Sequence, residues 1–177
     1  AIDRAGLVGA DGATHAGSFD LSFLRCIPNL VIMAPSNAIE MYQMLNTAYQ
    51  FNGPVCVRYP RGNSLIKDYT SDVALEIGKA NTARIGQKIA IFAFGTTLDQ
   101  ALIAGESLDA TVIDMRFVKP LDEKLILETS KTHQQLITIE DNAIAGGAGS
   151  SVSELLHAHH INTPLTLLGL PDNFTEQ

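Results

Sequence analysis

The sequence has 177 residues, and its 12 Lys and Arg against 19 Asp and Glu give a formal net charge of −7. An acidic chain without a basic stripe is a poor candidate for binding nucleic acid, and no apolar run approaches the roughly 18 residues of a membrane-spanning helix. Cys26 and Cys56 lie in apolar runs and form no disulfide framework or zinc motif, which fits a reducing cytoplasm.

The first third of the sequence predicts only part of an α/β domain. The apolar runs 30–34 and 55–59 are predicted to form buried strands. Between them, Asn37 followed three residues later by Glu40 is typical of a helix N-terminus. Apolar residues at helical spacing predict the buried face of this helix: Ile39, Met41, Met44, Leu45 and Ala48. Two strands and one or two helices cannot enclose a core, so we expect residues 1–62 to be the later part of a larger domain.

The rest of the sequence predicts a second, self-contained unit. Residues 63–76 are polar, aperiodic and rich in turn formers, and we interpret them as a linker. From residue 77 to residue 177, short apolar runs alternate with helical patterns, which is typical of a doubly wound, mostly parallel α/β sheet. The predicted strands are 89–94, 110–113, 136–139 and 165–168. The predicted helices begin after 95–97, at Asp122 and at the glycine turn 146–149.

A glycine-rich segment near the start of the chain carries the first candidate functional residues. Residues 3–17 contain four glycines together with Arg4, Asp11 and His15, without the period of a helix or a strand. Glycine lets a ligand approach the backbone closely, and a histidine within reach of a carboxylate can act as an acid or base near neutral pH. The segment fits a functional loop, and it also fits a glycine-rich turn with a solvated histidine.

The sequence Arg58-Tyr59-Pro60-Arg61-Gly62, at the carboxyl end of a predicted strand, is the second candidate. Ligands of open α/β sheets bind at this edge, and the guanidinium group matches phosphate or carboxylate. In a chain of charge −7, an anionic substrate requires local positive charge, which Arg4 and Arg61 could supply. The alternative is a surface arginine pair that forms ion pairs with nearby acids.

Two further groups carry weaker signals. His157, His159 and His160 gather at the predicted end of a helix, where solvent and the helix dipole accommodate them. No carboxylate or cysteine lies there at metal-ligand spacing, so we predict no metal site. The glycine turn 146–149 either binds an anion at a helix N-terminus or serves close packing, because the full dinucleotide-binding fingerprint is missing.

Several motifs together are similar to those of one enzyme family. They are Asp3-Arg4-Ala5-Gly6, Gly9-Ala10-Asp11-Gly12-Ala13-Thr14-His15, Val57-Arg58-Tyr59-Pro60-Arg61-Gly62, Arg116-Phe117-Val118-Lys119-Pro120-Leu121-Asp122 and Glu140-Asp141-Asn142-Ala143-Ile144-Ala145-Gly146-Gly147-Ala148-Gly149. Through them, nearly the whole chain resembles the 1-deoxy-D-xylulose-5-phosphate synthase family of transketolase-like, thiamine diphosphate-dependent enzymes. The fourth motif is shared by transketolase-like C-terminal domains in general, whereas the first three are more specific.

The resemblance implies an α/β fold in two parts. Residues 1–62 would be the later part of a pyrimidine-binding domain, and residues 77–177 would be most of a small, mostly parallel transketolase C-terminal domain without its final helix. The family is a transferase that condenses pyruvate with glyceraldehyde 3-phosphate and releases CO₂, using thiamine diphosphate and Mg²⁺. Its product feeds the synthesis of isoprenoids, thiamine and pyridoxal. The resemblance also implies a cytoplasmic homodimer without nucleic-acid or membrane partners.

The resemblance also implies roles for four residues. His15 would face the reacting carbon of the cofactor as a proton-transfer or positioning residue, and Asp11 would bind substrate hydroxyls or orient the site. Arg4 and Arg61 would grip the phosphate of glyceraldehyde 3-phosphate. This role agrees with the need of an acidic chain to gather positive charge around an anion.

The departures from the family matter as much as the matches. The family's Gly-Asp-Gly motif for diphosphate and Mg²⁺, and the glutamate that activates the aminopyrimidine, are not found in this sequence, which opens with Ala1 instead of Met. We therefore expect a part of a longer enzyme that binds neither cofactor nor metal and is inactive alone. The alternatives are another transketolase-like enzyme, such as transketolase or a pyruvate dehydrogenase β subunit, and a non-catalytic assembly module.

Overall fold

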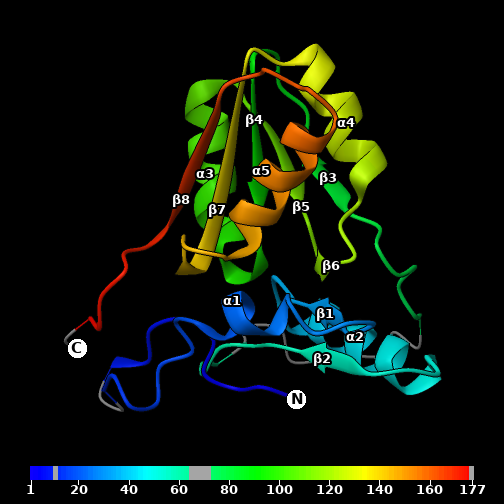
Figure 1. Ribbon diagram of the computed structural model, residues 1–177, viewed down its shortest axis with the longest axis vertical. Helices are drawn as coiled ribbons and strands as arrows, with labels where there is room; N and C mark the ends of the chain where they lie inside the picture. The colour runs from blue at the N-terminus through cyan, green and yellow to red at the C-terminus, as the bar shows by residue number, and fades with distance from the viewer. Residues whose placement is uncertain (10–11, 64–72, 176–177) are drawn as a thin grey trace.

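The computed structural model describes residues 1–9, 12–63 and 73–175. Figure 1 shows the described N-terminal elements on one side and the C-terminal elements on the other. The N-terminal elements are α1 (Asp20–Leu24), β1 (Val31–Met33), α2 (Ala38–Gln50) and β2 (Val55–Val57). The C-terminal elements are β3 (Asn81–Arg84), β4 (Ile89–Ala93), η2 (Gly95–Thr97), α3 (Leu98–Leu108), β5 (Thr111–Asp114), β6 (Phe117–Lys119), α4 (Glu123–Thr132), β7 (Gln135–Ala143), α5 (Ala148–Ala158) and β8 (Leu165–Leu170).

The C-terminal part is built around a five-stranded sheet in the order β3-β5-β4-β7-β8. Strand β4 runs parallel to both β5 and β7, and β7 runs parallel to β8, whereas the edge strand β3 is antiparallel to β5. The predicted mostly parallel α/β sheet is therefore confirmed. The antiparallel edge was not predicted, because Asn81-Thr82-Ala83-Arg84 is polar and largely exposed and thus lacks the apolar pattern of a strand.

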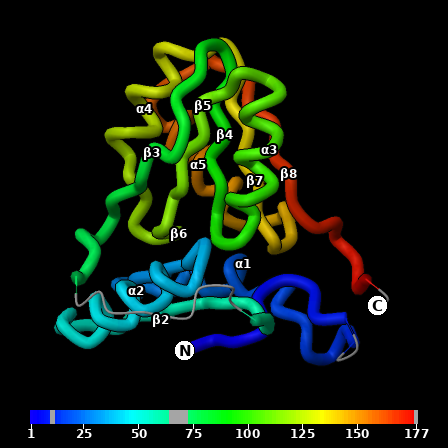
Figure 2. The backbone as a smooth tube through the Cα atoms, turned by 180° about the vertical axis from the view of Figure 1, so that it is seen from behind, coloured from blue at the N-terminus to red at the C-terminus, as the bar shows by residue number. Residues whose placement is uncertain are grey.

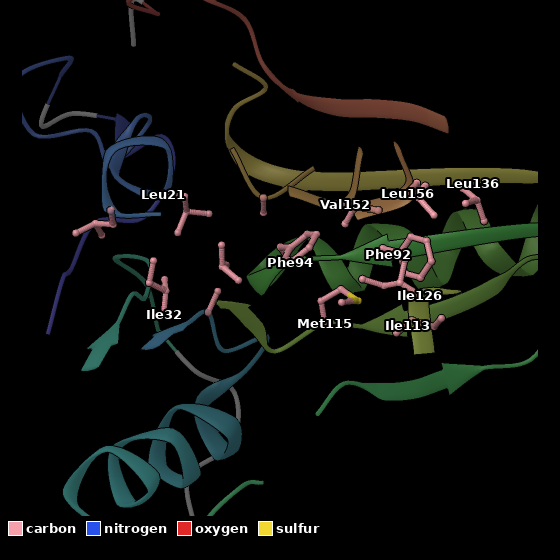
Figure 3. Packing of buried hydrophobic residues seen from close by; sticks show 14 of the residues in the cluster. Leu21, Ile32, Phe92, Phe94, Ile113, Met115, Ile126, Leu136, Val152 and Leu156 are labelled. Carbon is pink, nitrogen blue, oxygen red and sulfur yellow. The ribbon is translucent and has the colours of Figure 1, made fainter. Parts of the chain in front are cut away.

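Helices cover both faces of this sheet, because successive residues of a strand point to opposite sides. Ala90 and Phe92 of β4 belong to the large cluster that includes side chains of α4 and α5, while Ile91 and Ala93 pack with α3. The large cluster continues into the N-terminal part, where it includes Leu21 of α1 and Ile32 of β1 (Figure 3). The two parts of the chain thus share one hydrophobic core.

A second sheet joins the two parts through the backbone. Its order is β2-β1-β6, with β1 parallel to β2 and antiparallel to β6. Strand β6 follows β5 in the sequence, and Figure 2 shows it at the end of the C-terminal part that faces α2. Phe117 of β6 is fully buried among Met33 of β1, Val57 of β2 and Met44 of α2. This strand was not predicted, and it adds an apolar residue of the C-terminal part to the small N-terminal core.

Helix α2 begins as predicted, because the Asn37 side chain accepts a hydrogen bond of 3.0 Å from the Glu40 N–H. The predicted buried face is wrong in part. Met44 is fully buried, but Ile39 and Leu45 are 36% and 42% exposed. The helix instead turns the Glu40 carboxylate inward, where it meets Arg116 and Ser36.

The predicted linker 63–76 lies for the most part outside the described residues, which resume at Val73. The Leu75 N–H donates to the Thr47 hydroxyl over 2.7 Å, so the chain enters the C-terminal part along α2. Within the described ranges, no helix combines the length and the apolar character needed to cross a bilayer.

Candidate functional site

The first candidate segment lies beside the end of β2. Three backbone hydrogen bonds of 2.9–3.0 Å join Ile2 to Val57, Tyr59 to Ile2, and Ala5 to Tyr59. Residues 2–5 therefore extend the N-terminal sheet by a parallel strand-like segment. This pairing brings the backbone of Arg4 next to the Tyr59-Pro60-Arg61 sequence, although the two are more than fifty positions apart.

A second set of backbone hydrogen bonds closes the glycine-rich segment into a loop. The Gly17 N–H donates to the carbonyl oxygens of Arg4 and Gly6 over 2.8 and 3.0 Å, and the Gly6 N–H donates back to the Gly17 oxygen over 3.3 Å. Gly6 has a φ of +71°, which favours glycine. A Cβ at Gly17 would overlap the Arg4 carbonyl oxygen, so only glycine allows this pairing.

The loop carries the predicted histidine on the surface. The His15 side chain is exposed, and its Nδ1 lies 3.0 Å from the Thr14 hydroxyl. The Arg4 side chain is 37% exposed, and its Nη1 lies 3.0 Å from the Asp3 carboxylate. Arg61 is also exposed. Backbone pairing thus places the segment of Arg4 beside the end of the His15 loop and beside the strand end that leads to Arg61, and we call residues 2–6, 12–17 and 58–61 the loop cluster. Asp11 lies outside the described residues.

The most deeply buried charge of this cluster is Arg58, which the sequence pointed to only as a neighbour of Arg61. Its side chain is 1% exposed. Its Nε donates to Asp20 over 2.8 Å, its Nη1 to the Asp141 carboxylate, and its Nη2 to the Gly17 carbonyl oxygen over 2.7 Å. Burial raises the pKa of the Asp20 carboxyl, and the Arg58 guanidinium opposes this shift. Because Asp141 belongs to β7, the ion pair joins the C-terminal part to the loop cluster.

A second buried cluster also crosses between the two parts. The Glu40 carboxylate accepts hydrogen bonds from Arg116 Nε over 2.6 Å and from the Ser36 hydroxyl over 2.8 Å. Asp114, 1% exposed, accepts the Arg116 N–H over 3.2 Å. Burial, with the nearby Glu40 carboxylate, raises the pKa of Asp114 to about 7. No signal in the sequence pairs these groups, because Glu40 and Arg116 stand 76 positions apart.

The two alternatives for the glycine turn 146–149 are now distinguished. The N–H groups of Ala148 and Gly149 donate to the Glu140 carboxylate over 2.7 and 2.8 Å, so the helix N-terminus binds an anion of the chain itself. Burial raises the pKa of Glu140 to about 7, against these two hydrogen bonds. A Cβ at Gly147 would overlap the same carboxylate, which explains the glycine.

A pocket of about 570 Å³ opens near the loop cluster, and both parts of the chain line it. Ser36 and Asn37 form one wall at the start of α2, Tyr59 follows β2, and Thr96 and Asp99 belong to the C-terminal part. The three histidines at the end of α5 lie elsewhere. Among the residues that the structure describes, no group of three His, Cys, Asp or Glu side chains could hold a metal ion.

Comparison with known protein families assigns both parts of the chain. Residues 1–65 match the family described as "Transketolase, pyrimidine binding domain", and residues 78–177 match "Transketolase, C-terminal domain". The first range includes β1 and β2, and the second includes β3 to β8. The second match alone covers more than half of the chain.

Two curated relatives are similar over the whole sequence. A 1-deoxy-D-xylulose-5-phosphate synthase from Nitrosococcus oceani is 60% identical over 99% of this chain and 28% of its own length. A protein of the same name from Yersinia pestis is 59% identical over 100% of this chain and 29% of its own length. The chain thus spans less than a third of the relatives that it matches.

Two solved structures are similar in fold. A protein described as "Split gene transketolase, inactive beta4 tetramer" is 29% identical, with a TM-score of 0.86 over 98% of this chain and 57% of its own. The transketolase of Campylobacter jejuni is 19% identical, with a TM-score of 0.69 over 99% of this chain and 27% of its own, and it supports the fold alone.

Proposed function

Since this chain belongs to the transketolase family, we propose that it is part of a 1-deoxy-D-xylulose-5-phosphate synthase. Such an enzyme condenses pyruvate with glyceraldehyde 3-phosphate and releases CO₂. The observation that carries the proposal is identity: it reaches 59–60% with relatives of that name and only 29% and 19% with the two transketolase structures. The same difference favours the synthase over transketolase itself, which is the second candidate.

In this proposal, Arg4 and Arg61 bind the phosphate of the aldehyde. Their segments are paired through the hydrogen bond from Ala5, next to Arg4, to Tyr59, two residues before Arg61, and both side chains reach solvent. Two guanidinium groups in a chain of charge −7 provide a local site for a dianion. A phosphate held away from the reacting carbon fixes the aldehyde in place and so lowers the entropic cost of the condensation.

His15 and Asp11 complete the proposed site on the same loop. We infer that His15 holds or transfers a proton near the reacting carbonyl oxygen, because its side chain is exposed and an imidazole ring has one nitrogen that can donate and one that can accept a proton. Asp11 is proposed to bind substrate hydroxyls or to orient the loop. The proposed domains are the pyrimidine-binding part at 1–62, a linker at 63–76 and the C-terminal domain at 77–177.

The cofactor is proposed to be thiamine diphosphate with Mg²⁺, which supplies the electron sink for decarboxylation when bound. The described residues do not fit its diphosphate–metal part, because they offer no cluster of three possible ligands. We therefore infer that other segments of the enzyme hold the cofactor and that this chain alone does not catalyse the condensation. In keeping with this, the similar beta4 tetramer of a split gene transketolase is described as inactive.

We also propose that the enzyme is a cytoplasmic homodimer that binds neither nucleic acid nor membranes. The net charge of −7 opposes binding to phosphate backbones and to anionic lipids. Helix α2 exposes Leu45 at 42% and Tyr49 at 91%, and α1 exposes Phe23 at 59%. Such apolar side chains are typical of surfaces that a neighbouring segment or subunit covers.

The Arg61→Ala variant of the full-length enzyme tests the phosphate site. Loss of one charged contact to phosphate should raise the KM for glyceraldehyde 3-phosphate about tenfold or more, while the KM for pyruvate stays nearly unchanged. Steady-state kinetics with each substrate varied in turn measure both constants. Arg84→Ala is the matched control, because Arg84 belongs to β3 and pairs with Asp109. Equal effects of Arg61→Ala on both substrates would exclude the assignment.

A further inference from the structure

The buried Arg58 forms ion pairs with Asp20 of the N-terminal part and Asp141 of the C-terminal part. Asp141 also contacts other residues. Asp141 Oδ2 accepts the Thr96 hydroxyl over 3.5 Å, and a Cβ at Gly6 would lie 3.1 Å from the Asp141 Cβ. The next residues of β7 hydrogen-bond to the N-terminal part: Asn142 Oδ1 accepts the Leu21 N–H over 3.1 Å. Asp141 therefore lies between Thr96 of η2 and Gly6 of the N-terminal part.

Arg58 connects Asp141 to the loop cluster through its hydrogen bonds. Its Nη2 donates to the Gly17 carbonyl oxygen, and the Gly17 N–H in turn donates to the Arg4 carbonyl oxygen. Its own backbone N–H donates to Met33 over 2.9 Å, and the next residue pairs with Ile2. One guanidinium group thus joins the segment of Arg4, the base of the His15 loop and the strand end that leads to Arg61.

The ion pair with Asp141 can be removed without leaving Arg58 unpaired. The Asp20 carboxylate keeps its hydrogen bond of 2.8 Å to Nε. The Asp141 side chain is 21% exposed, so an amide in its place still reaches water. Removing the Asp141 carboxylate is therefore expected to shift the Arg58 guanidinium toward Asp20 with little loss of stability. Removing Arg58 itself would leave the Asp20 carboxylate buried without its partner, which is strongly destabilising.

We propose that Asp141 and Arg58 are positioning residues that align Arg4, Arg61 and the His15 loop for the phosphorylated aldehyde, so that the C-terminal domain takes part in substrate recognition. The inference rests on the proposed function, since it names the phosphate site defined there. It goes further because it assigns a part in substrate binding to the C-terminal domain, to which none of the four proposed site residues belongs.

The Asp141→Asn variant of the full-length enzyme tests the inference. The KM for glyceraldehyde 3-phosphate should rise about tenfold, since small displacements of binding groups have effects of this size, while the KM for pyruvate should stay within about twofold. In the Arg61→Ala background, Asp141→Asn should add little, because both changes act on the same contact. A merely structural role would give additive effects.

Glu154→Gln is the matched control. It removes another ion pair between the two parts, Arg25–Glu154 at 2.5 Å, without touching Arg58. Both KM values of this variant should remain at the parent level. An equal rise of both KM values in Asp141→Asn, or full additivity with Arg61→Ala, would overturn the inference while leaving the proposed function intact.

Amide hydrogen exchange separates the inference from the proposed function. Asp141→Asn should speed exchange of the Gly6 and Gly17 N–H groups several-fold, because the carbonyl of Gly17 loses a fixed donor. Glu154→Gln should not change these rates. Parent protein that does not condense the two substrates would contradict the proposed function alone. Unchanged exchange at Gly6 and Gly17 would contradict the inference, whatever the activity.

Discussion

Asp114 shows how a single buried carboxyl can make stability depend on pH. Burial and the Glu40 carboxylate raise its pKa from 3.8 to about 7 in the folded chain. Between these two values the folded chain keeps the proton and the unfolded chain loses it. The free energy of unfolding therefore falls as the pH rises from 3.8 to about 7, and the loss persists above pH 7.

The Asp114→Asn variant should relieve this loss. An amide keeps the volume and a hydrogen-bond donor toward Glu40 but does not ionise. At pH 8 the free energy of unfolding should rise by at least about 1 kcal/mol over the parent, and at pH 4 the gain should disappear. Urea unfolding of the chain at both pH values measures the difference. Asp172→Asn, at an exposed position, is the control; a gain at pH 4 as large as that at pH 8 would contradict the assignment.

For single residues, the sequence predicts which functional side chains share a segment better than it predicts which side chains of distant segments contact one another. The glycines around His15 and the arginines of the strand end were singled out as candidates because their chemistry is visible locally, and the structure shows backbone pairing between their segments. Glu40, in contrast, looked like a residue of the first helical turn, yet it is buried against Arg116. Arg58 was noted only within the motif that ends at Arg61 and Gly62, and its partner Asp141 lies 83 positions away.

Among the elements, helix α2 allows a direct test of the predicted start signal. The Asn37→Ala variant removes the side-chain oxygen that accepts the Glu40 N–H. The free energy of unfolding should fall by about 1 kcal/mol, which is typical for loss of an N-cap. Urea unfolding of the chain measures it, with Asn52→Ala, at an exposed position after the helix, as the control. Equal stability of the Asn37 and Asn52 variants would show that the cap is dispensable.

The strands of the five-stranded sheet divide into those that the sequence predicts and those that it does not. Strands β4, β5, β7 and β8 are short apolar runs, and each was predicted in place, although β7 extends four residues further, to Ala143. Strand β3 is polar and exposed, and β6 has only three residues. Both are held by pairing with a neighbour, which a local apolar pattern does not reveal.

For the whole molecule, packing does not follow the boundary that the sequence suggests. The sequence predicts a linker at 63–76 between two units, but β6 joins the N-terminal sheet and one core runs through both parts of the chain. Arg58–Asp141, Arg116–Glu40 and Arg25–Glu154 are ion pairs across the same junction. The two parts are therefore expected to act as one body, with the candidate phosphate site at their junction.

The most direct test of the account is a condensation assay with pyruvate and glyceraldehyde 3-phosphate, in the presence of thiamine diphosphate and Mg²⁺. The full-length enzyme and the 177-residue chain are assayed side by side for CO₂ and for the five-carbon ketose phosphate. We predict that the full-length enzyme forms both in equal amounts and that the chain alone forms neither. Product from the isolated chain would contradict the proposed division of the site. Two-carbon transfer from a ketose phosphate by the full-length enzyme, without release of CO₂, would contradict the synthase itself.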